Sequence, residues 1–97
     1  MISDKTVERL ASFFKVLGDE TRVRIICAVS ENEKCVSEIS DELNVSQSAV
    51  SHQLKLLKME GHVKSRRDGK NIYYSIDDEH VLDIIEKAIS HIRHKFK

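Results

Sequence analysis

Three glycines and the absence of proline constrain the fold of this 97-residue chain more than any other feature of its sequence. Gly18, Gly61 and Gly69 each stand where a regular apolar pattern stops. Glycine tolerates a positive φ angle, which suits helix C-termini and tight turns. A chain without proline offers nothing that resembles a rigid linker. We therefore expect one domain over residues 1–97, built from short elements joined by tight turns.

Apolar residues recur at helical spacing in four segments. In chain order these faces are Val7, Leu10, Ala11, Phe14 and Leu17; Val23, Ile26, Cys27 and Val29; Val50, Leu54 and Leu57; and Val81, Ile84, Ile85, Ala88, Ile89 and Ile92. A short further helix is expected over residues 38–43. Side chains that can cap a helix precede all but the first helix, at Asp19, Ser37, Ser46 and Asp77-Asp78. We also expect Cys27, on its apolar face, in the core.

Two strand-like runs lie between the fourth and the last helix. Residues 62–67 and 71–76 flank Asp68-Gly69, a dipeptide typical of hairpin turns. Residues 31–34 are predicted to be a polar break. The result is a mainly α fold with a small β-hairpin. Two short helices joined by a tight turn at Asn44-Val45, then a basic hairpin, indicate a winged helix-turn-helix.

The helix over residues 47–60 is the predicted DNA-reading helix, because the second helix of this motif lies in the major groove. Opposite its apolar stripe it carries polar side chains at one-turn spacing: Ser48, Ser51, His52 and Lys55. With Gln47 at the helix N-terminus, they suit base edges and phosphates. The hairpin adds cations for the DNA backbone, namely Lys64, Arg66, Arg67 and Lys70. For His52 alone, an ordinary surface histidine is an equal alternative.

Charge and composition restrict the class of protein. Sixteen basic and sixteen acidic side chains balance overall, but residues 31–45 are acidic and residues 52–71 are basic. Apolar residues at 40% and charged residues at 33% are typical of a globular chain, and the apolar runs are too short for a transmembrane helix. With no signal-like N-terminus and only two cysteines, we expect a cytoplasmic protein that does not bind membranes.

Metal-ligating residues cluster in the last helix, in the pattern Asp78-x-His80-x10-His91-x2-His94. Each pair lies on one stretch of helix and can chelate together, but His80 and His91 are separated by roughly 16 Å of helical rise. Two antiparallel copies of the helix would bring opposite pairs together, with the isoleucine-rich face as the dimer contact. Three imidazoles and one carboxylate form a closed tetrahedral set that suits Zn²⁺ or Co²⁺. With no open position, such a site is suited to sensing or structure.

The chain resembles the ArsR/SmtB family of metal-responsive repressors. Residues 15–22 (KVLGDETR), residues 43–57 (LNVSQSAVSHQLKLL) and the terminal ligand pattern carry the resemblance, which extends from about Leu10 to His94. It implies a homodimer, joined through its N- and C-terminal helices, that leaves its operator DNA when metal binds. Gln47, Ser48, Ser51 and His52 match the positions used on DNA, and Asp78, His80, His91 and His94 match the ligands. The family also implies a hydrogen bond from a ligating histidine, here His91, to the carbonyl near His62.

One departure from the family restricts which metal ion we expect the chain to sense. Sensors of arsenic, cadmium and lead use a Cys-x-Cys pair where this chain has Cys35-Val36-Ser37, so the second thiolate is missing. The N-terminus also lacks the extra histidine expected of a nickel sensor. We therefore predict a zinc- or cobalt-responsive repressor.

Two alternatives stay open at this point. The chain is a dimeric winged-helix regulator without a metal response, or a small protein-interaction module that uses its apolar last helix. An enzyme is not expected, because neither cysteine has an obvious histidine partner and there is no glycine-rich phosphate loop. The sequence does not determine the operator, the regulated genes or the choice between zinc and cobalt.

Overall fold

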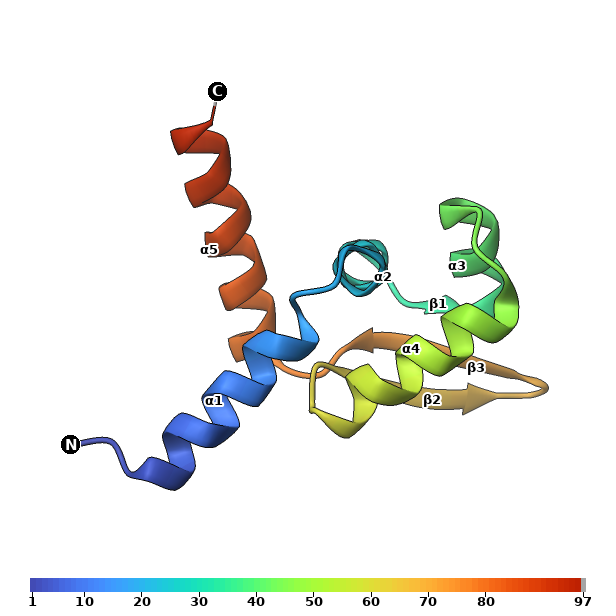
Figure 1. Cartoon of the computed structure of the whole chain (residues 1–97). Coiled ribbons are helices and arrows are strands. Elements are labelled where there is room, and N and C mark those ends of the chain that lie inside the picture. The colour runs from blue at the N-terminus through green and yellow to red at the C-terminus, as the bar shows by residue number, and fades with distance from the viewer. Residues whose placement is uncertain (97) are drawn as a thin grey trace.

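The computed structural model describes residues 1–96 and is mainly helical with a small antiparallel sheet (Figure 1). Its elements are α1 (Asp4–Val16), α2 (Glu20–Glu31), β1 (Lys34–Cys35), α3 (Val36–Leu43), α4 (Gln47–Met59), β2 (Val63–Asp68), β3 (Asn71–Ile76) and α5 (Glu79–Lys95). The predicted fold class is therefore confirmed. Helix α4, the predicted DNA-reading helix, ends one residue earlier than expected, with Glu60 as its C-cap.

Three of the predicted helix caps are confirmed. The side chains of Asp19, Ser46 and Asp78 accept hydrogen bonds from backbone N–H groups at 3.1, 3.2 and 3.0 Å. Each bond satisfies a donor that the first helical turn leaves free.

The predicted Ser37 cap is wrong. Helix α3 begins at Val36, with Cys35 as the N-cap. The backbone N–H of Cys35 donates to Glu38 Oε1 at 3.0 Å. The helix starts early because residues 34 and 35 form a strand, and the chain turns into the helix at the end of that strand.

The predicted polar break before α3 is therefore partly wrong, since Lys34 and Cys35 pair with Tyr74 and Tyr73 of β3. The sheet has three strands in the order β1-β3-β2, where a two-stranded hairpin was expected. The β2–β3 hairpin pairs Asp68 with Asn71, so its two-residue loop begins at Gly69 and not at Asp68. Gly69 has a φ angle of +64°, which explains the glycine there.

The core is formed by α2, α3, α4 and β2. Its fully buried apolar side chains are Ile25, Ile26, Val29, Ile39, Val50, Leu54, Leu57 and Val63. The predicted stripe of α4 is confirmed. The predicted face of α2 is partly wrong, because Val23 is exposed and Cys27 is only half-buried. Those two residues, one turn apart, line the apolar groove beside α1 and α5, and Cys27 is not among the buried core residues.

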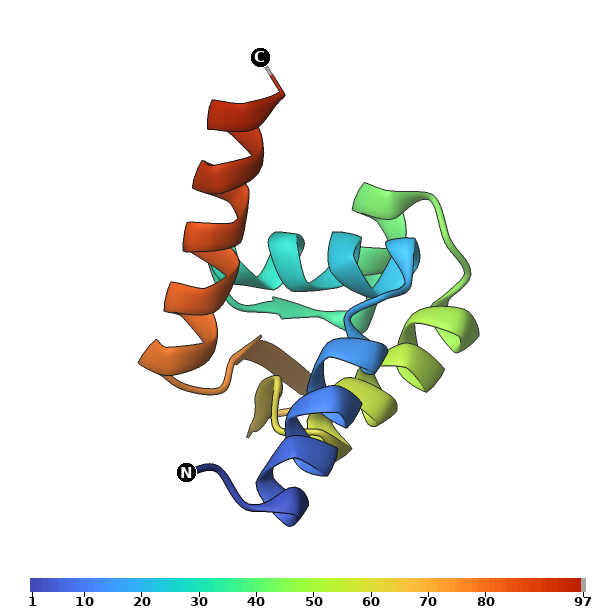
Figure 2. The same ribbon diagram turned by 60° about the vertical axis from the view of Figure 1, so that its left-hand side comes forward.

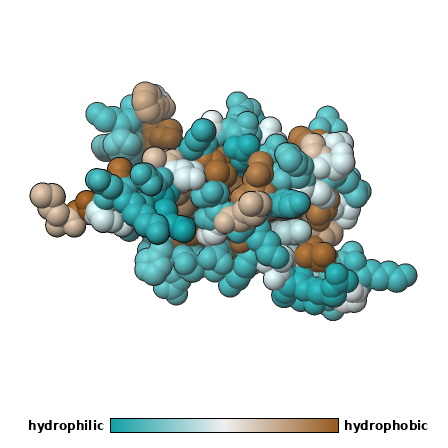
Figure 3. Space-filling model, turned by 60° about the horizontal axis from the view of Figure 1, so that its bottom comes forward, coloured by the Kyte–Doolittle hydropathy of each residue, from teal (hydrophilic) through white to brown (hydrophobic). Residues whose placement is uncertain are grey.

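Helices α1 and α5 lie outside this core, and both views show α5 extending away from the rest of the molecule (Figures 1 and 2). Helix α1 buries no residue, and α5 buries only Val81. An apolar groove of about 290 Å³ runs between α1, α2 and α5. Elsewhere on the surface, apolar side chains also emerge among hydrophilic ones (Figure 3). Within residues 1–96, no helix has the length and apolar character needed to cross a bilayer.

His62 is a titratable residue within the core, with 0% of its surface exposed. Its Nε2 lies 3.1 Å from the carbonyl oxygen of Phe13, and its ring stacks on the Phe13 ring at a centroid distance of 4.1 Å. Burial lowers the pKa of His62 below 6.5, although the Phe13 carbonyl, the charge of Glu60 and the Leu57 carbonyl oppose the shift. The folded protein therefore favours the neutral imidazole.

We expect the free energy of unfolding to fall as the pH drops from 7.5 to 5.5. The unfolded chain takes up the His62 proton near its ordinary pKa of 6.5, whereas the folded chain takes it up only at lower pH, so stability is lost below 6.5. The carboxyl groups of Glu33 and Glu38, with pKa values lowered from 4.5 by hydrogen bonds to Arg66 and to Cys35, stay ionised in this range.

Urea denaturation at several pH values measures this dependence. The His62→Gln variant should have a flatter slope of unfolding free energy against pH, and the exposed His52→Gln variant should keep the wild-type slope. An equal slope in wild type and His62→Gln would contradict the assignment.

Candidate nucleic-acid interface and metal ligands

The α3–α4 unit has the geometry of a helix-turn-helix. Asn44 adopts the left-handed conformation with a φ angle of 56°, which ends α3. The turn is closed by Ser40, which accepts from the backbone N–H of Val45 at 3.2 Å and donates its hydroxyl to the Val45 carbonyl. Helix α4 therefore leaves the turn in a fixed direction.

Helix α4 has one buried and one exposed face. Its apolar stripe is fully buried, whereas the five polar side chains predicted to read DNA are all exposed: Gln47, Ser48, Ser51, His52 and Lys55. Gln47 and Ser51 also line a shallow depression of about 330 Å³ that Lys70 and Asn71 complete from the hairpin. The N-terminal half of α4 and the tip of the hairpin thus border the same depression, which Val36, Ile72 and Tyr74 also line.

The four predicted cations of the hairpin are exposed, but they are not equivalent. Arg66 forms ion pairs with Glu33 and, at 3.8 Å, with Asp68, and it lies 5.1 Å from the centre of the Tyr73 ring. Hydrogen bonding to Glu33 raises the pKa of the Arg66 guanidinium.

Lys64, Arg67 and Lys70 have no ion-pair partner among the described residues. The strand alternation places Arg67 on the same face of β2 as Ser65, whose hydroxyl accepts from Lys58 of α4 at 2.7 Å. Arg67 therefore shares the α4 side of the hairpin. The Arg66–Glu33 pair was not predicted, because its residues are far apart in sequence.

The predicted metal ligands form two separate pairs on α5. Asp78 Oδ1 lies 3.7 Å from Nδ1 of His80, and their side chains are 52% and 93% exposed. His91 and His94 lie at the other end of the helix, both exposed. Within residues 1–96, no group of three or more candidate ligands comes together. The two pairs of predicted ligands are therefore separate within one protomer, and their role as metal ligands stays a prediction.

The predicted bond from His91 to the carbonyl near His62 is not formed in the described part of this single chain. The His62 carbonyl accepts from the backbone N–H of Asp77 at 3.1 Å. A carbonyl oxygen has two lone pairs, so it can accept a second bond. The role of His91 toward this carbonyl stays a prediction.

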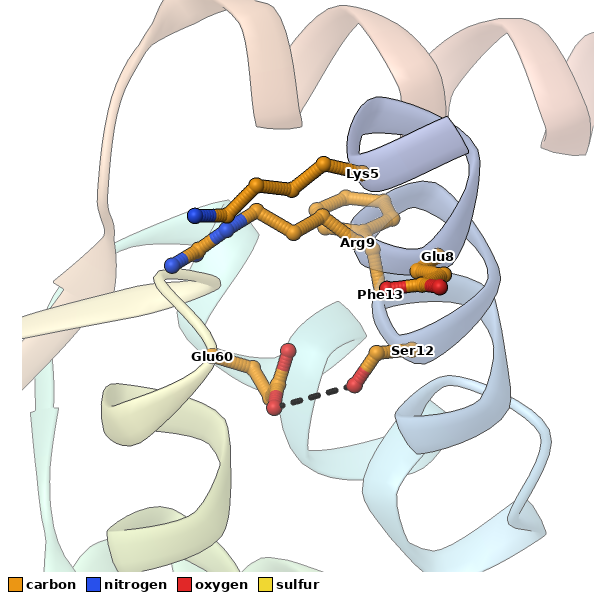
Figure 4. A pocket seen from close by; sticks show the side chains of 6 residues that line it. All are labelled: Lys5, Glu8, Arg9, Ser12, Phe13 and Glu60. Carbon is orange, nitrogen blue, oxygen red and sulfur yellow. Dashed lines mark hydrogen bonds between the residues drawn. The ribbon is translucent and has the colours of Figure 1, made fainter. Parts of the chain in front are cut away.

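Polar contacts that the sequence did not indicate join α1 to α4. Ser12 of α1 donates to Glu60 Oε2 at 3.2 Å across an open pocket of about 530 Å³ (Figure 4). Lys5, Glu8 and Arg9 line the same pocket, so both signs of charge face it. Arg22 of α2 donates to the Val16 carbonyl at 3.2 Å and to Gln53 of α4 at 2.7 Å.

Comparison with known proteins identifies similar sequences over most of the chain. A family model described as "Bacterial regulatory protein, arsR family" matches residues 19–65. The transcriptional repressor SmtB homolog of Synechocystis is 40% identical over 89% of this chain and 65% of its own length. The cadmium resistance regulatory protein CadC homolog of Staphylococcus aureus is 46% identical over 87% of this chain and 70% of its own length.

A solved structure shows the same fold. The homodimeric winged helix-turn-helix DNA-binding domain of a possible ArsR-family regulator from Mycobacterium bovis superimposes with a TM-score of 0.91. The match covers 100% of this chain and 93% of that domain, at 24% sequence identity.

Two substitutions test whether Asp78 stabilises α5 as its N-cap. Asp78→Ala removes the cap of α5 and should lower the free energy of unfolding by about 1 kcal/mol. Asp78→Asn should change it by only a few tenths, since asparagine caps as well as aspartate. Chemical denaturation measures both. Equal destabilisation by the two variants would show that the carboxylate charge, and not the cap, stabilises the helix.

Proposed function

Because this chain belongs to the ArsR/SmtB family of bacterial regulatory proteins, we propose that it is a repressor that binds operator DNA as a homodimer and is released by zinc or cobalt. The relatives reported above are transcriptional regulators and not enzymes. The observation that carries the proposal is the exposed polar face of α4 beside the basic hairpin, with the opposite face of α4 fully buried.

On DNA, α4 lies in the major groove. Gln47, Ser48, Ser51 and His52 contact base edges, where their hydrogen bonds supply specificity. Lys55 and the hairpin cations contact phosphates, which supplies affinity and salt dependence. Among those cations Arg66 contributes least, because it must first leave Glu33.

The dimer forms through α1 and α5. Their exposed apolar side chains, Val7, Leu10, Phe14, Ile84 and Ile92, flank the apolar groove between α1, α2 and α5. A second copy covers this surface by a two-fold operation, which pairs the same patch on both subunits. Two α4 helices then face two half-sites of a palindromic operator.

The residues of α5 suit a tetrahedral ion shared between subunits. Asp78 and His80 of one chain meet His91 and His94 of the partner subunit, so the dimer has two equivalent sites. Asp78 uses Oδ1 to cap α5, which leaves Oδ2 for an ion, and the His80 ring is exposed. When bound, the ion cross-links the two helices. Release from DNA requires that the free dimer bind metal more tightly than the DNA-bound dimer does.

The cysteines do not favour a thiolate-rich site. Cys35 Sγ lies 3.2 Å from the Ser37 hydroxyl, where a second cysteine would be needed. Cys27 lines the apolar groove. A soft metal prefers several thiolates, whereas imidazole and carboxylate suit zinc and cobalt. Cadmium resistance is stated of the CadC homolog and is not proposed for this chain.

Two adjacent arginines provide a matched test of DNA binding. Arg67→Gln should reduce the slope of log affinity against log salt by about one, because one phosphate contact is lost. Arg66→Gln should reduce it less, since that guanidinium pairs with Glu33. Fluorescence anisotropy on DNA selected by the wild-type chain measures both, with Arg24→Gln as control. Identical slopes in all proteins would contradict the assigned role of the hairpin.

Mixed dimers test whether the metal site crosses the interface. One variant carries Asp78→Asn with His80→Ala, and another carries His91→Ala with His94→Ala. Each homodimer should lose zinc binding. A mixture of the two variants should regain one site per mixed dimer, because one of its two sites combines the intact Asp78–His80 pair of one subunit with the intact His91–His94 pair of the other. Isothermal titration with zinc measures the stoichiometry. No recovery in the mixture, after subunit exchange is verified, would contradict a shared site.

Operator affinity with and without zinc tests regulation. In wild type, saturating zinc should weaken operator affinity at least about tenfold, a coupling of typical size. Unchanged affinity would leave a DNA-binding regulator without a metal response.

A further inference from the structure

Helix α1 has two distinct sides. The apolar side chains of Val7, Leu10 and Phe14 are each about half exposed, at 51%, 48% and 52%. The other side contacts the DNA-reading unit through three polar groups: the Ser12 hydroxyl, the Phe13 carbonyl and the Val16 carbonyl. Helix α1 buries no residue completely, and these polar contacts attach it to the protomer beside the packing of Val16 and Leu17 against the core. We call them the α1 seam.

Every contact of the α1 seam leads to α4 or to the turn that follows it. Ser12 donates to Glu60, the C-cap of α4. Phe13 pairs with His62, two residues later. Val16 accepts from Arg22, whose Nε donates to Gln53 within α4 at 2.7 Å. The seam therefore joins the helix that carries exposed apolar residues to the helix that carries the DNA-reading face.

His62 is the most buried member of the seam. Its ring stacks on Phe13 with an interplanar angle of 21°. Its backbone N–H donates to the Leu57 carbonyl at 2.9 Å, and its own carbonyl accepts from Asp77 at 3.1 Å, just before the cap of α5. One residue thus contacts α1, α4 and the start of α5. Rotation of α1 relative to α4 would break the stack and the bond together.

The chemistry of His62 indicates a role beyond filling space. When Nε2 of the neutral ring donates to the Phe13 carbonyl, Nδ1 must act as an acceptor. Nδ1 is buried and has no hydrogen-bond partner. An unsatisfied buried polar atom is destabilising, and a phenyl ring would fill similar space without that cost. The histidine adds a directional bond to α1 that a purely apolar ring lacks.

We propose that the α1 seam, with His62 at its centre, fixes the angle between α1 and the recognition helix and so sets the operator half-site spacing that the dimer accepts. The inference rests on the proposed function, since it requires a dimer joined through α1 and α5. In such a dimer, the relative placement of the two α4 helices depends on how rigidly each is held to its dimer helix. His62 is then a positioning residue and not a DNA contact.

The first experiment measures rigidity within one protomer. Spin labels are attached through Lys15→Cys and Met59→Cys after replacement of Cys27 and Cys35, and the labelled chain is diluted with unlabelled chain. His62→Phe and Arg22→Met should broaden the distance distribution between α1 and α4. Arg24→Met, which affects only an exposed pair with Glu20 on the same helix as Arg22, should leave it unchanged. An unbroadened distribution in both seam variants, shown to be folded by circular dichroism, would overturn the proposal.

The second experiment measures spacing preference on a palindrome selected from random DNA by the wild-type chain. Each inserted base pair rotates one half-site by about 35° relative to the other, so wild type should lose at least about tenfold in affinity per insertion. In the seam variants this loss should shrink to within about threefold, with affinity for a single half-site unchanged. A purely structural defect would weaken both DNAs equally.

Retention of the wild-type spacing preference in the seam variants would overturn the proposal. A dimeric wild type that is indifferent to spacing would also overturn the seam proposal, whereas a monomeric wild-type chain would overturn the dimeric function itself. That failure is recognised because it appears before any substitution is made.

Discussion

The burial of one stripe of α4 is the constraint on which the rest of the structure depends. Val50, Leu54 and Leu57 are fully buried against α2, α3 and β2. Each contributes about 1.5–3 kcal/mol on leaving water. Once this stripe is inside, the helical period places Ser48, Ser51 and His52 outside. The same packing that holds the domain together therefore presents the polar face that we propose reads DNA.

Features set by neighbouring residues could be predicted from the sequence. The caps at Asp19, Ser46 and Asp78 and the tight turn at Asn44-Val45 depend on residues close in sequence. Strand β1 was missed because its two residues are not apolar-patterned and pair with β3 some forty residues later. The placement of Cys27 was missed because a helical pattern does not say which apolar neighbour a residue will face.

In the candidate sites, too, local features could be predicted and contacts between distant segments could not. Exposure of the polar face of α4 and the separation of the ligand pairs on α5 follow from helical geometry alone. The Arg66–Glu33 pair and the contacts of Arg22 and His62 join distant segments, and no local pattern indicates them. Sequence reasoning therefore predicts which side chains carry the chemistry, whereas the structure identifies what holds them in position.

The closure of the core within a single chain has a consequence for assembly. The buried core residues come from α2, α3, α4 and β2 of one chain, with Val16 of α1 and Ile85 of α5 packed against them, so a single protomer closes its own core. For a protomer that is stable alone, occupancy of a two-fold operator would rise with the square of subunit concentration while monomer predominates. The cellular abundance of the chain would thus set the threshold of repression alongside any effector.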